Sequence, residues 1–356
     1  MKAIVISSRA DHVHLSDACA YDAEDAIVDA LGADLLTSAT DLAQLERRYD
    51  IAFIFGISYP RIEDSLARLL PKVRDRIDGP LIGYLFGSYG VNSVNLNPVK
   101  RMLGRRKAWF SRFDRLYLGI GDDADMIADR LNVKTHYLPM AANVLDVGAA
   151  PYVSRDDRPI AVNAFGRQKK DILEAFCDRL NRPDSSELVY YSNLLKLGHA
   201  TDLWRYRDMF WQLLRRSRLS TAFDHFFANE GKAQLSYVGP RWFESLAAGT
   251  VVIGRAPETE DRARLLDWTD AVIDLSGDPK TATDELVALL ADDQRIRRAS
   301  RENLVQMSLR HDWGHRLAEI LEVEGLEKPE GLTRRLKTLE DAAAALREDA
   351  VRASVA

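Results

Sequence analysis

Short apolar runs alternate with amphipathic stretches along most of the chain. The runs are rich in Val, Ile, Leu and Phe, and a continuous apolar run of this length predicts a strand buried on both faces. They cover residues 2–8, 50–57, 80–87, 114–121, 135–141, 158–166, 186–192 and 250–254. Helical spacing of apolar positions predicts helices over 23–32, 42–49, 63–77, 123–131, 170–180, 203–217, 242–249 and 283–293. This alternation predicts an α/β fold with parallel sheets.

The alternating pattern is interrupted once, over residues 144–158, by a stretch rich in Gly, Pro and Asp. Such a stretch indicates a linker. We therefore expect an N-terminal domain over 1–150, a second domain over 151–325 and a helical tail over 326–356 that lies on the surface and frays. Two consecutive α/β blocks of similar size predict two Rossmann-like domains facing a cleft, with ligands at the carboxyl ends of the strands.

Composition and charge narrow the class of protein. The 356 residues are 46% hydrophobic and 29% charged, as in ordinary soluble domains. The net charge of −5 gives no electrostatic case for a nucleic-acid partner. The two cysteines, Cys19 and Cys177, stand apart without metal-like neighbours, which fits a reducing cytoplasm. No run approaches the roughly 20 apolar residues of a membrane span, so we expect a cytoplasmic protein, with peripheral contact at the inner face of the membrane left open.

The first chemistry-bearing segment is AVNAFGRQKK, residues 161–170. A predicted strand ends at Phe165 and Gly166, and basic side chains follow at the start of a helix: Arg167, Lys169 and Lys170. The free N–H groups of a helix N-terminus, with arginine and lysine beside them, form a good anion site. Cations at this end of a helix oppose its dipole, so solvated lysines alone explain the pattern less well.

The second segment is GPRWFESLAAGTVVIG, residues 239–254. It predicts a helix followed by a strand, with Arg241 and Glu244 on one face of the first helical turn. A carboxylate there is favoured by the helix dipole and can accept hydrogen bonds from ribose hydroxyls. Taken alone, such a pair is more often a surface ion pair worth under about 1 kcal/mol.

Together these segments resemble a known family. The sequences FGRQKK, SYVGPRWFESLAAGTVVIG and DDQRIRRASRENLVQMSLRHDWGHRLAEIL are similar to the group 1 (family 4-like) glycosyltransferases of GT-B fold, closest to the bacterial branch of CgeB-like glycosyltransferases. The resemblance covers about residues 158–325. Residues before it are similar only in layout.

The resemblance implies a site for a nucleoside diphosphate sugar in the second domain. Arg167 with Lys169 or Lys170 would bind the diphosphate, and Glu244 would bind the ribose. Arg167 and Glu244 are accordingly the catalytic candidates there. The other donor-side positions that it implies are Gly166, Ser236, Tyr237, Gly239 and Arg241. It implies no cofactor and no metal.

The sequence departs from the family pattern at two places. Many relatives carry a second glutamate eight residues before the ribose ligand, and this chain has Ser236 there. Many also carry a histidine after the fourth N-terminal strand, where this chain offers Ser88 and Tyr89 on the acceptor side. Whether transfer retains or inverts the stereochemistry is therefore left open.

Four further groups of residues have competing interpretations. Asp11 and His12 follow the first strand and would supply a base for an acceptor hydroxyl, or form a plain polar loop. The acidic residues at 122–125 read better as a helix start than as a metal site. His311 and His315 are spaced like metal ligands, but Trp313 between them favours packing and helix capping. In the run 203–217 we expect Trp, Tyr, Phe and Leu to face the core and the arginines to face water, with an anionic surface or a lipid-linked acceptor as the alternative.

The expected function is that of a bacterial hexosyltransferase of polysaccharide biosynthesis. Its partners would be a nucleotide sugar and a saccharide, lipid-linked or protein acceptor, with no nucleic acid. Two alternatives stay open: a nucleotide-sugar epimerase of similar fold, and a non-catalytic binder that keeps the donor pocket. The serine at 236 is the best argument for the binder.

Overall fold

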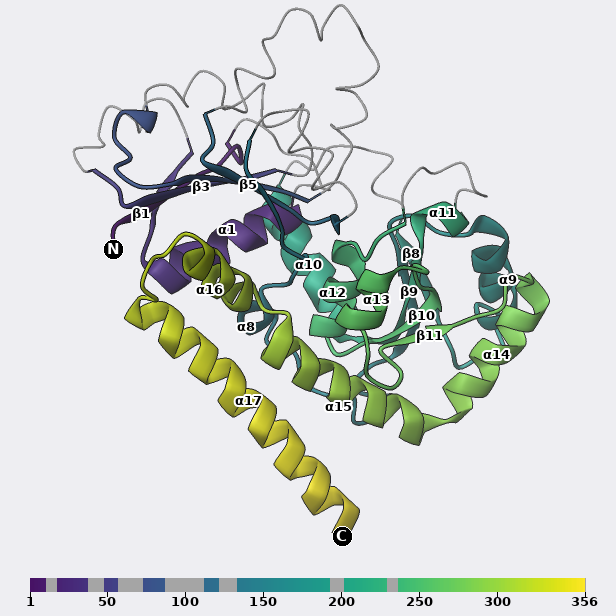
Figure 1. Cartoon of the computed structure of the whole chain (residues 1–356). Coiled ribbons are helices and arrows are strands. Elements are labelled where there is room, and N and C mark those ends of the chain that lie inside the picture. Colours follow the sequence, from purple (N-terminus) through teal and green to yellow (C-terminus); the bar gives the residue numbers. More distant parts are fainter. Residues whose placement is uncertain are drawn as a thin grey trace, which may run out of the picture. The chain divides into compact units, whose positions relative to one another are not determined.

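The chain folds into two α/β units (Figure 1). The computed structural model describes residues 1–10, 18–37, 48–56, 73–86, 112–121, 133–192, 202–228 and 236–355. Unit 1 comprises residues 1–141, 199–203 and 313–338, and unit 2 comprises residues 142–198, 204–312 and 339–356. None of the helices that the structure describes has the length and apolar character to cross a membrane.

Unit 1 is built on a six-stranded parallel sheet of order β2-β1-β3-β4-β5-β6. The strands are β1 (Ala3–Ile6), β2 (Asp34–Leu36), β3 (Ile51–Gly56), β4 (Leu81–Leu85), β5 (Arg115–Leu118) and β6 (Thr135–Tyr137). Helices α1 (Ala18–Leu31) and α16 (Trp313–Val323) pack against each other and cover one face of this sheet. Trp313 is buried and makes edge contacts with the rings of Phe55 and Tyr84, so α16 completes the core of this unit.

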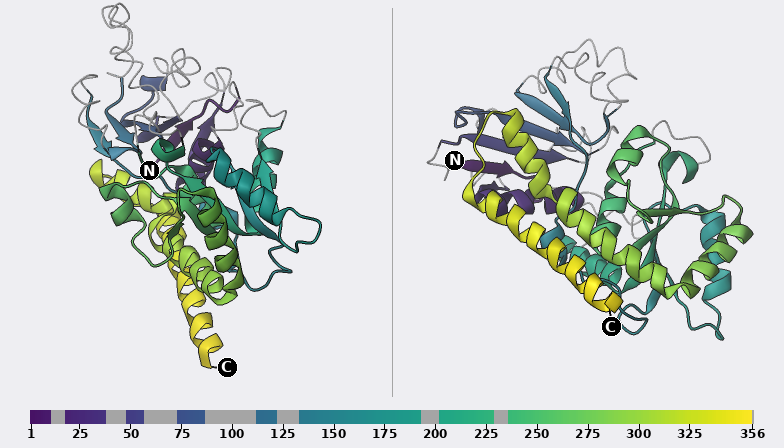
Figure 2. Two further views of the ribbon diagram at one scale, coloured as in Figure 1. Left: turned by 90° about the vertical axis from the view of Figure 1, so that its right-hand side faces the viewer. Right: turned by 60° about the horizontal axis from the view of Figure 1, so that its bottom comes forward.

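Unit 2 holds a five-stranded parallel sheet of order β11-β10-β9-β7-β8. Its strands are β7 (Ile160–Phe165), β8 (Val189–Ser192), β9 (Ser217–Phe223), β10 (Val251–Arg255) and β11 (Val272–Asp274). Its helices are α8 (Val144–Val147), α9 (Lys170–Leu180), α10 (Leu203–Arg215), α11 (His225–Ala228), α12 (Pro240–Ala247), α13 (Glu260–Leu265), α14 (Pro279–Ala291) and α15 (Asp293–Arg310). Helices α9 and α14 lie side by side on one face, and α12 lies on the other (Figures 1 and 2). The predicted α/β fold class is confirmed.

The stretch expected to be a linker contains a structural anchor. Arg158 is buried, and its guanidinium donates to the carbonyl oxygens of Ser217, Gly249 and Ala248 at 2.9, 3.0 and 3.0 Å, and to that of Ala150. Burial lowers the pKa of Arg158 to about 10. Ala248 is the C-cap residue of α12, and the last carbonyls of a helix have no partner within the helix. The guanidinium of Arg158 supplies the missing hydrogen bonds at the C-terminus of α12.

Helix α17 (Glu330–Val355) corrects the expectation of a fraying surface tail. One stripe of it is buried, with Leu332, Leu339 and Ala343 at most 1% exposed. At its start, a Cβ added to Gly331 would stand 2.5 Å from the carbonyl oxygen of Ala30 in α1. Only glycine permits this close approach, so the helix is fitted to unit 1 at its beginning.

Candidate functional site

Arg241 connects the turn after β7 to the start of α12. Its Nη1 donates to the carbonyl oxygen of Arg167 at 2.6 Å. The guanidinium also lies against Gly166, where an added Cβ would stand 2.5 Å from Nη2. Gly166 has φ +69, a conformation that side-chain-bearing residues rarely adopt. The structure thus brings together the two segments singled out in the sequence, FGRQKK and GPRWFESLAAG.

Glu244 is buried beside a different arginine from the one expected. Its Oε1 lies 2.5 Å from Nη2 of Arg207 on α10, and both side chains are 9% exposed. Cζ of Arg207 stands over the rings of Phe210 and Trp211, at 4.6 and 4.5 Å from their centroids. The interpretation of Arg241 and Glu244 as a surface ion pair is therefore wrong, because Glu244 is enclosed and paired across unit 2.

The same contact corrects the expectation for the run 203–217. Arg207 is buried, whereas Trp204 is 46% exposed. Leu203, Phe210 and Leu214 do face the core. The pair with Glu244 and the two ring contacts compensate for removing the guanidinium from water.

The second oxygen of Glu244 is available to a ligand. Within the described part of the chain no hydrogen bond reaches Oε2, and it is not among the fully buried side-chain atoms that lack a partner. A carboxylate with one oxygen held by an arginine and the other open can accept from a hydroxyl in a fixed direction.

His225 is a titratable group beside the two arginines that sequence reasoning missed. It follows β9 at the start of α11, next to Asp224. Burial lowers the pKa of its imidazole, and Arg167 and Arg241 lower that pKa further by repulsion, against the opposing effect of Asp224. His225 therefore lies close to the two arginines. No strand was predicted over residues 217–223, so nothing in the sequence analysis marked His225 as lying at the end of a strand.

The two lysines occupy different environments. Lys169 is the N-cap residue of α9. Its side chain is only 17% exposed, and its Nζ lies 3.5 Å from Oδ2 of Asp171. Lys170 is 88% exposed and lies 3.4 Å from Glu174, one turn further along the helix. Of the two, Lys169 is the one enclosed near the turn.

The N-terminus of α12 faces this turn without a side-chain cap. Gly239 is its N-cap residue and Pro240 its first residue. Tyr237 packs against Gly239, where an added Cβ would stand 3.2 Å from the ring, and Ser236 is half-buried. Uncapped N–H groups at the start of a helix can bind an anion.

A buried carboxylate of unit 1 was also missed. Glu24 of α1 accepts from Ser7 Oγ at 2.5 Å and pairs with Arg9 at 2.7 Å, at the carboxyl end of β1. Burial raises its pKa to about 7, although Arg9 opposes the shift. The contacts among Ser7, Arg9 and Glu24 hold the backbone in place directly after β1.

Several predicted residues lie outside the described residues: Asp11, His12, Ser88, Tyr89 and the acidic residues at 122–125. His311 is buried and caps α15, and its ring packs on Phe243, so the packing interpretation is confirmed for it. Across the described ranges, no group of three His, Cys, Asp or Glu residues is arranged to hold a metal ion.

Comparison with known proteins finds a family similarity in the second half of the chain. Residues 170–322 match the model of the family described as glycosyl transferase-like. The match includes Lys170, His225, Arg241 and Glu244, and begins just after Gly166 and Arg167. No protein of curated function matches the sequence.

Solved structures share the fold of nearly the whole chain. HepE of Anabaena, in complex with UDP and glucose, aligns over 91% of this chain and 99% of its own, with 10% identity and a TM-score of 0.53. HepE with UDP-glucose aligns with 11% identity, the same coverages and a TM-score of 0.54. The N-terminal domain of Candida albicans trehalose-6-phosphate phosphatase aligns over 91% and 96%, with 7% identity and a TM-score of 0.54. The chain therefore has the GT-B fold, as predicted; the CgeB-like branch stays a prediction.

Proposed function

We propose that the protein transfers a hexose from a nucleoside diphosphate hexose to a saccharide, lipid-linked or protein acceptor. The observation that carries this proposal is the position of two residues on α12. Arg241 lies at the Gly166–Arg167 turn, and Glu244 has an open carboxylate oxygen three residues later. Helix α12 thus offers a cation that can bind a diphosphate and a carboxylate that can accept hydrogen bonds from ribose hydroxyls. A nucleoside diphosphate requires both groups.

In this proposal the diphosphate lies at the turn after β7. Arg167, Arg241 and the uncapped N-terminus of α12 would hold its oxygens, with His225 beside them. Bond cleavage at the sugar leaves additional negative charge on the diphosphate. Fixed donors and cations already aimed at that position would stabilise the charge as it develops, so positioning and electrostatics supply the catalysis.

The ribose would bind at Glu244. Its Oε2 accepts from the ribose hydroxyls, while Arg207 keeps Oε1 in place. Because Arg207 is itself held over the rings of Phe210 and Trp211, the carboxylate is oriented before the ligand arrives. Arg207 is in this sense a positioning residue.

Calorimetry with nucleotides tests the donor site. UDP, GDP, TDP, ADP and CMP are titrated into the protein, with UDP first because HepE binds it. For the nucleotide that binds, Glu244→Gln is expected to weaken affinity about tenfold, or about 1.4 kcal/mol. The same variant leaves the affinity for the 2′,3′-dideoxy nucleotide unchanged, since that ligand has no hydroxyl to lose. Absence of binding by all five nucleotides contradicts the proposed function.

A hydrolysis assay separates an enzyme from a binder. A transferase lacking its acceptor is expected to hydrolyse its nucleotide sugar slowly, with release of nucleoside diphosphate. A protein that binds the nucleotide sugar and releases none would support the non-catalytic alternative instead.

A further inference from the structure

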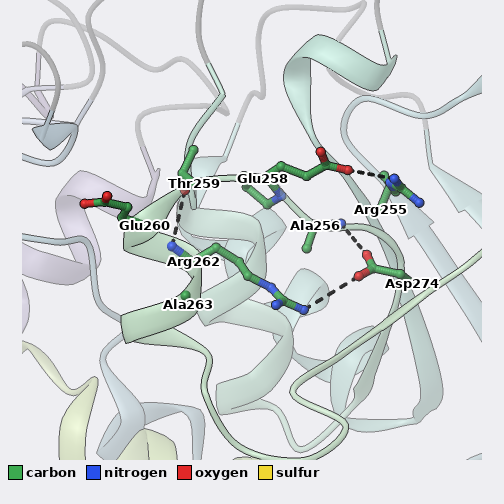
Figure 3. Close-up of a pocket in the computed structure, with 9 residues that line it drawn as sticks. Arg255, Ala256, Glu258, Thr259, Glu260, Arg262, Ala263 and Asp274 are labelled. Atoms are coloured by element: carbon green, nitrogen blue, oxygen red, sulfur yellow. Dashed lines mark hydrogen bonds and ion pairs between the residues drawn. The ribbon is translucent and has the colours of Figure 1, made fainter.

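A pocket of about 410 Å³ opens at the carboxyl ends of β10 and β11 (Figure 3). It is lined by the loop and first turn after β10 and by the end of β11: Arg255, Ala256, Pro257, Glu258, Thr259, Glu260, Arg262, Ala263 and Asp274. All of these residues belong to unit 2. No aromatic or large aliphatic side chain takes part, so the walls are formed by charged and small groups.

The pocket adjoins the candidate diphosphate site. The N–H of Asp224 donates to the carbonyl oxygen of Arg255 at 2.8 Å, which joins the ends of β9 and β10 directly in front of His225. Neighbouring strands lie about 4.8 Å apart, so the ends of β7, β9 and β10 together span roughly 10 Å. In a nucleotide sugar the sugar is attached to the outer phosphate and must lie beside the diphosphate.

The charged groups of the pocket are placed to bind hydroxyls. Nη2 of Arg262 is 3.6 Å from Oδ2 of Asp274, which is too long for a direct hydrogen bond. Oδ1 of Asp274 is already used, because it accepts from the N–H of Ala256 at 2.7 Å. Nε of Arg262 is buried and has no partner within the described residues. Figure 3 shows the Arg262 side chain extended toward Asp274.

A hydroxyl group suits such a pair better than an ion does. It can donate to the Asp274 carboxylate and at the same time accept from the Arg262 guanidinium, whereas a phosphate only accepts and an ammonium only donates. Arg255 and Glu258 form a second guanidinium–carboxylate pair on the pocket wall, at 2.7 Å. Two such pairs match a molecule that carries several hydroxyls.

The balance of charge argues against an acidic sugar. The lining contains two cations, Arg255 and Arg262, and three carboxylates, Glu258, Glu260 and Asp274, which gives a formal charge of 2 − 3 = −1. A uronate would add a like charge to a lining that is already net negative, which disfavours its binding.

We propose that this pocket binds the sugar of the donor, and that the sugar is an uncharged hexose. This inference rests on the proposed function, and adds the sugar class and the residues that select it. Asp274 and Arg262 are the specificity-determining residues, bridged by one hexose hydroxyl.

The test compares ligands that differ only in the sugar. Affinities are measured for the nucleoside diphosphate that binds in the calorimetric panel, for its glucose ester and for its glucuronic acid ester; for UDP these are UDP-glucose and UDP-glucuronic acid. The variants are Asp274→Asn, which keeps an oxygen for Ala256, and Arg262→Met. Arg264→Met is the matched control, because Arg264 is on the same helix, pairs with Asp261 at 3.0 Å and does not line the pocket.

We expect both pocket variants to bind UDP-glucose about tenfold more weakly and UDP within twofold of the wild type, while the control binds both as before. Wild-type protein should bind UDP-glucuronic acid at least about tenfold more weakly than UDP-glucose. Equal effects of the pocket variants on UDP and UDP-glucose, or preference for the glucuronic acid ester, would overturn the sugar assignment alone. Absence of any nucleotide binding would overturn the proposed function and this inference with it.

Discussion

Arg207 and Glu244 form an ion pair that is almost closed to solvent, with Nη2 and Oε1 2.5 Å apart and each side chain 9% exposed. The two residues come from α10 and α12, and the aromatic rings of Phe210 and Trp211 cover the guanidinium. A pair of this kind contributes little net stability over an apolar replacement, but removing one partner leaves a buried charge uncompensated.

Replacing Arg207 by methionine is therefore expected to lower the free energy of unfolding by about 3 kcal/mol, because Glu244 is left buried without its cation. Urea denaturation at pH 7 measures this value. The double variant R207M/E244Q should recover much of the loss, since no charge then remains. Arg205→Met, an exposed position on the same helix, should change stability by less than about 0.5 kcal/mol. Strict additivity in the double variant would contradict the pairing.

Gly166→Ala is expected to weaken nucleotide binding through Arg241. The new methyl would stand 2.5 Å from Arg241 Nη2, so the guanidinium must leave the turn, and φ +69 adds backbone strain. We expect the affinity for UDP to fall about tenfold in calorimetry. Gly325→Ala is the control: its φ is +68 but nothing lies within 4 Å of its added Cβ, so it carries the strain without the clash. Equal affinity in both variants would show that Arg241 does not hold the diphosphate.

His225 predicts a pH dependence of donor binding. Burial and the two neighbouring arginines lower its pKa in the free protein, and the arriving diphosphate should raise it. Proton binding and ligand binding then favour each other, so the affinity for UDP-glucose should increase as the pH falls from the raised pKa of the complex to the lowered pKa of the free protein, which lies below the ordinary value of 6.5. His225→Gln should flatten this dependence between pH 5 and 7.5. If the pH profile of the wild type is as flat as that of the variant, His225 does not interact with the diphosphate.

The fold was readable from the sequence because parallel strands buried on both faces leave a direct hydrophobic signal. The run before Gly166 became β7, and the helix predicted over 170–180 was found at those bounds. The burial of one stripe of α17 was missed. Leu332, Leu336 and Leu339 repeat at helical spacing, but the abundance of alanine and charge around them favoured a solvated helix.

The candidate site was only partly readable. Pairing the two segments around Gly166 and Glu244 was correct in space, but the partner of Glu244 was not. A hydropathy pattern predicts that an arginine is exposed to solvent unless its partner is known. The partner of Arg207, Glu244, is 37 residues away in the sequence, and only the tertiary fold brings the two together. The pocket at Arg262 and Asp274 likewise depends on two strand ends that only the sheet order places side by side.

The anchoring of α12 by Arg158 has a consequence for the proposed transfer reaction. Carbonyls at and just after the end of this helix are fixed by Arg158, and Ser300 also donates to Gly249 at 2.6 Å. A helix immobilised at its far end does not have to rotate or shift when negative charge builds up at its near end. The helix dipole is therefore already oriented in the folded protein, and it needs little reorganisation after a substrate has bound.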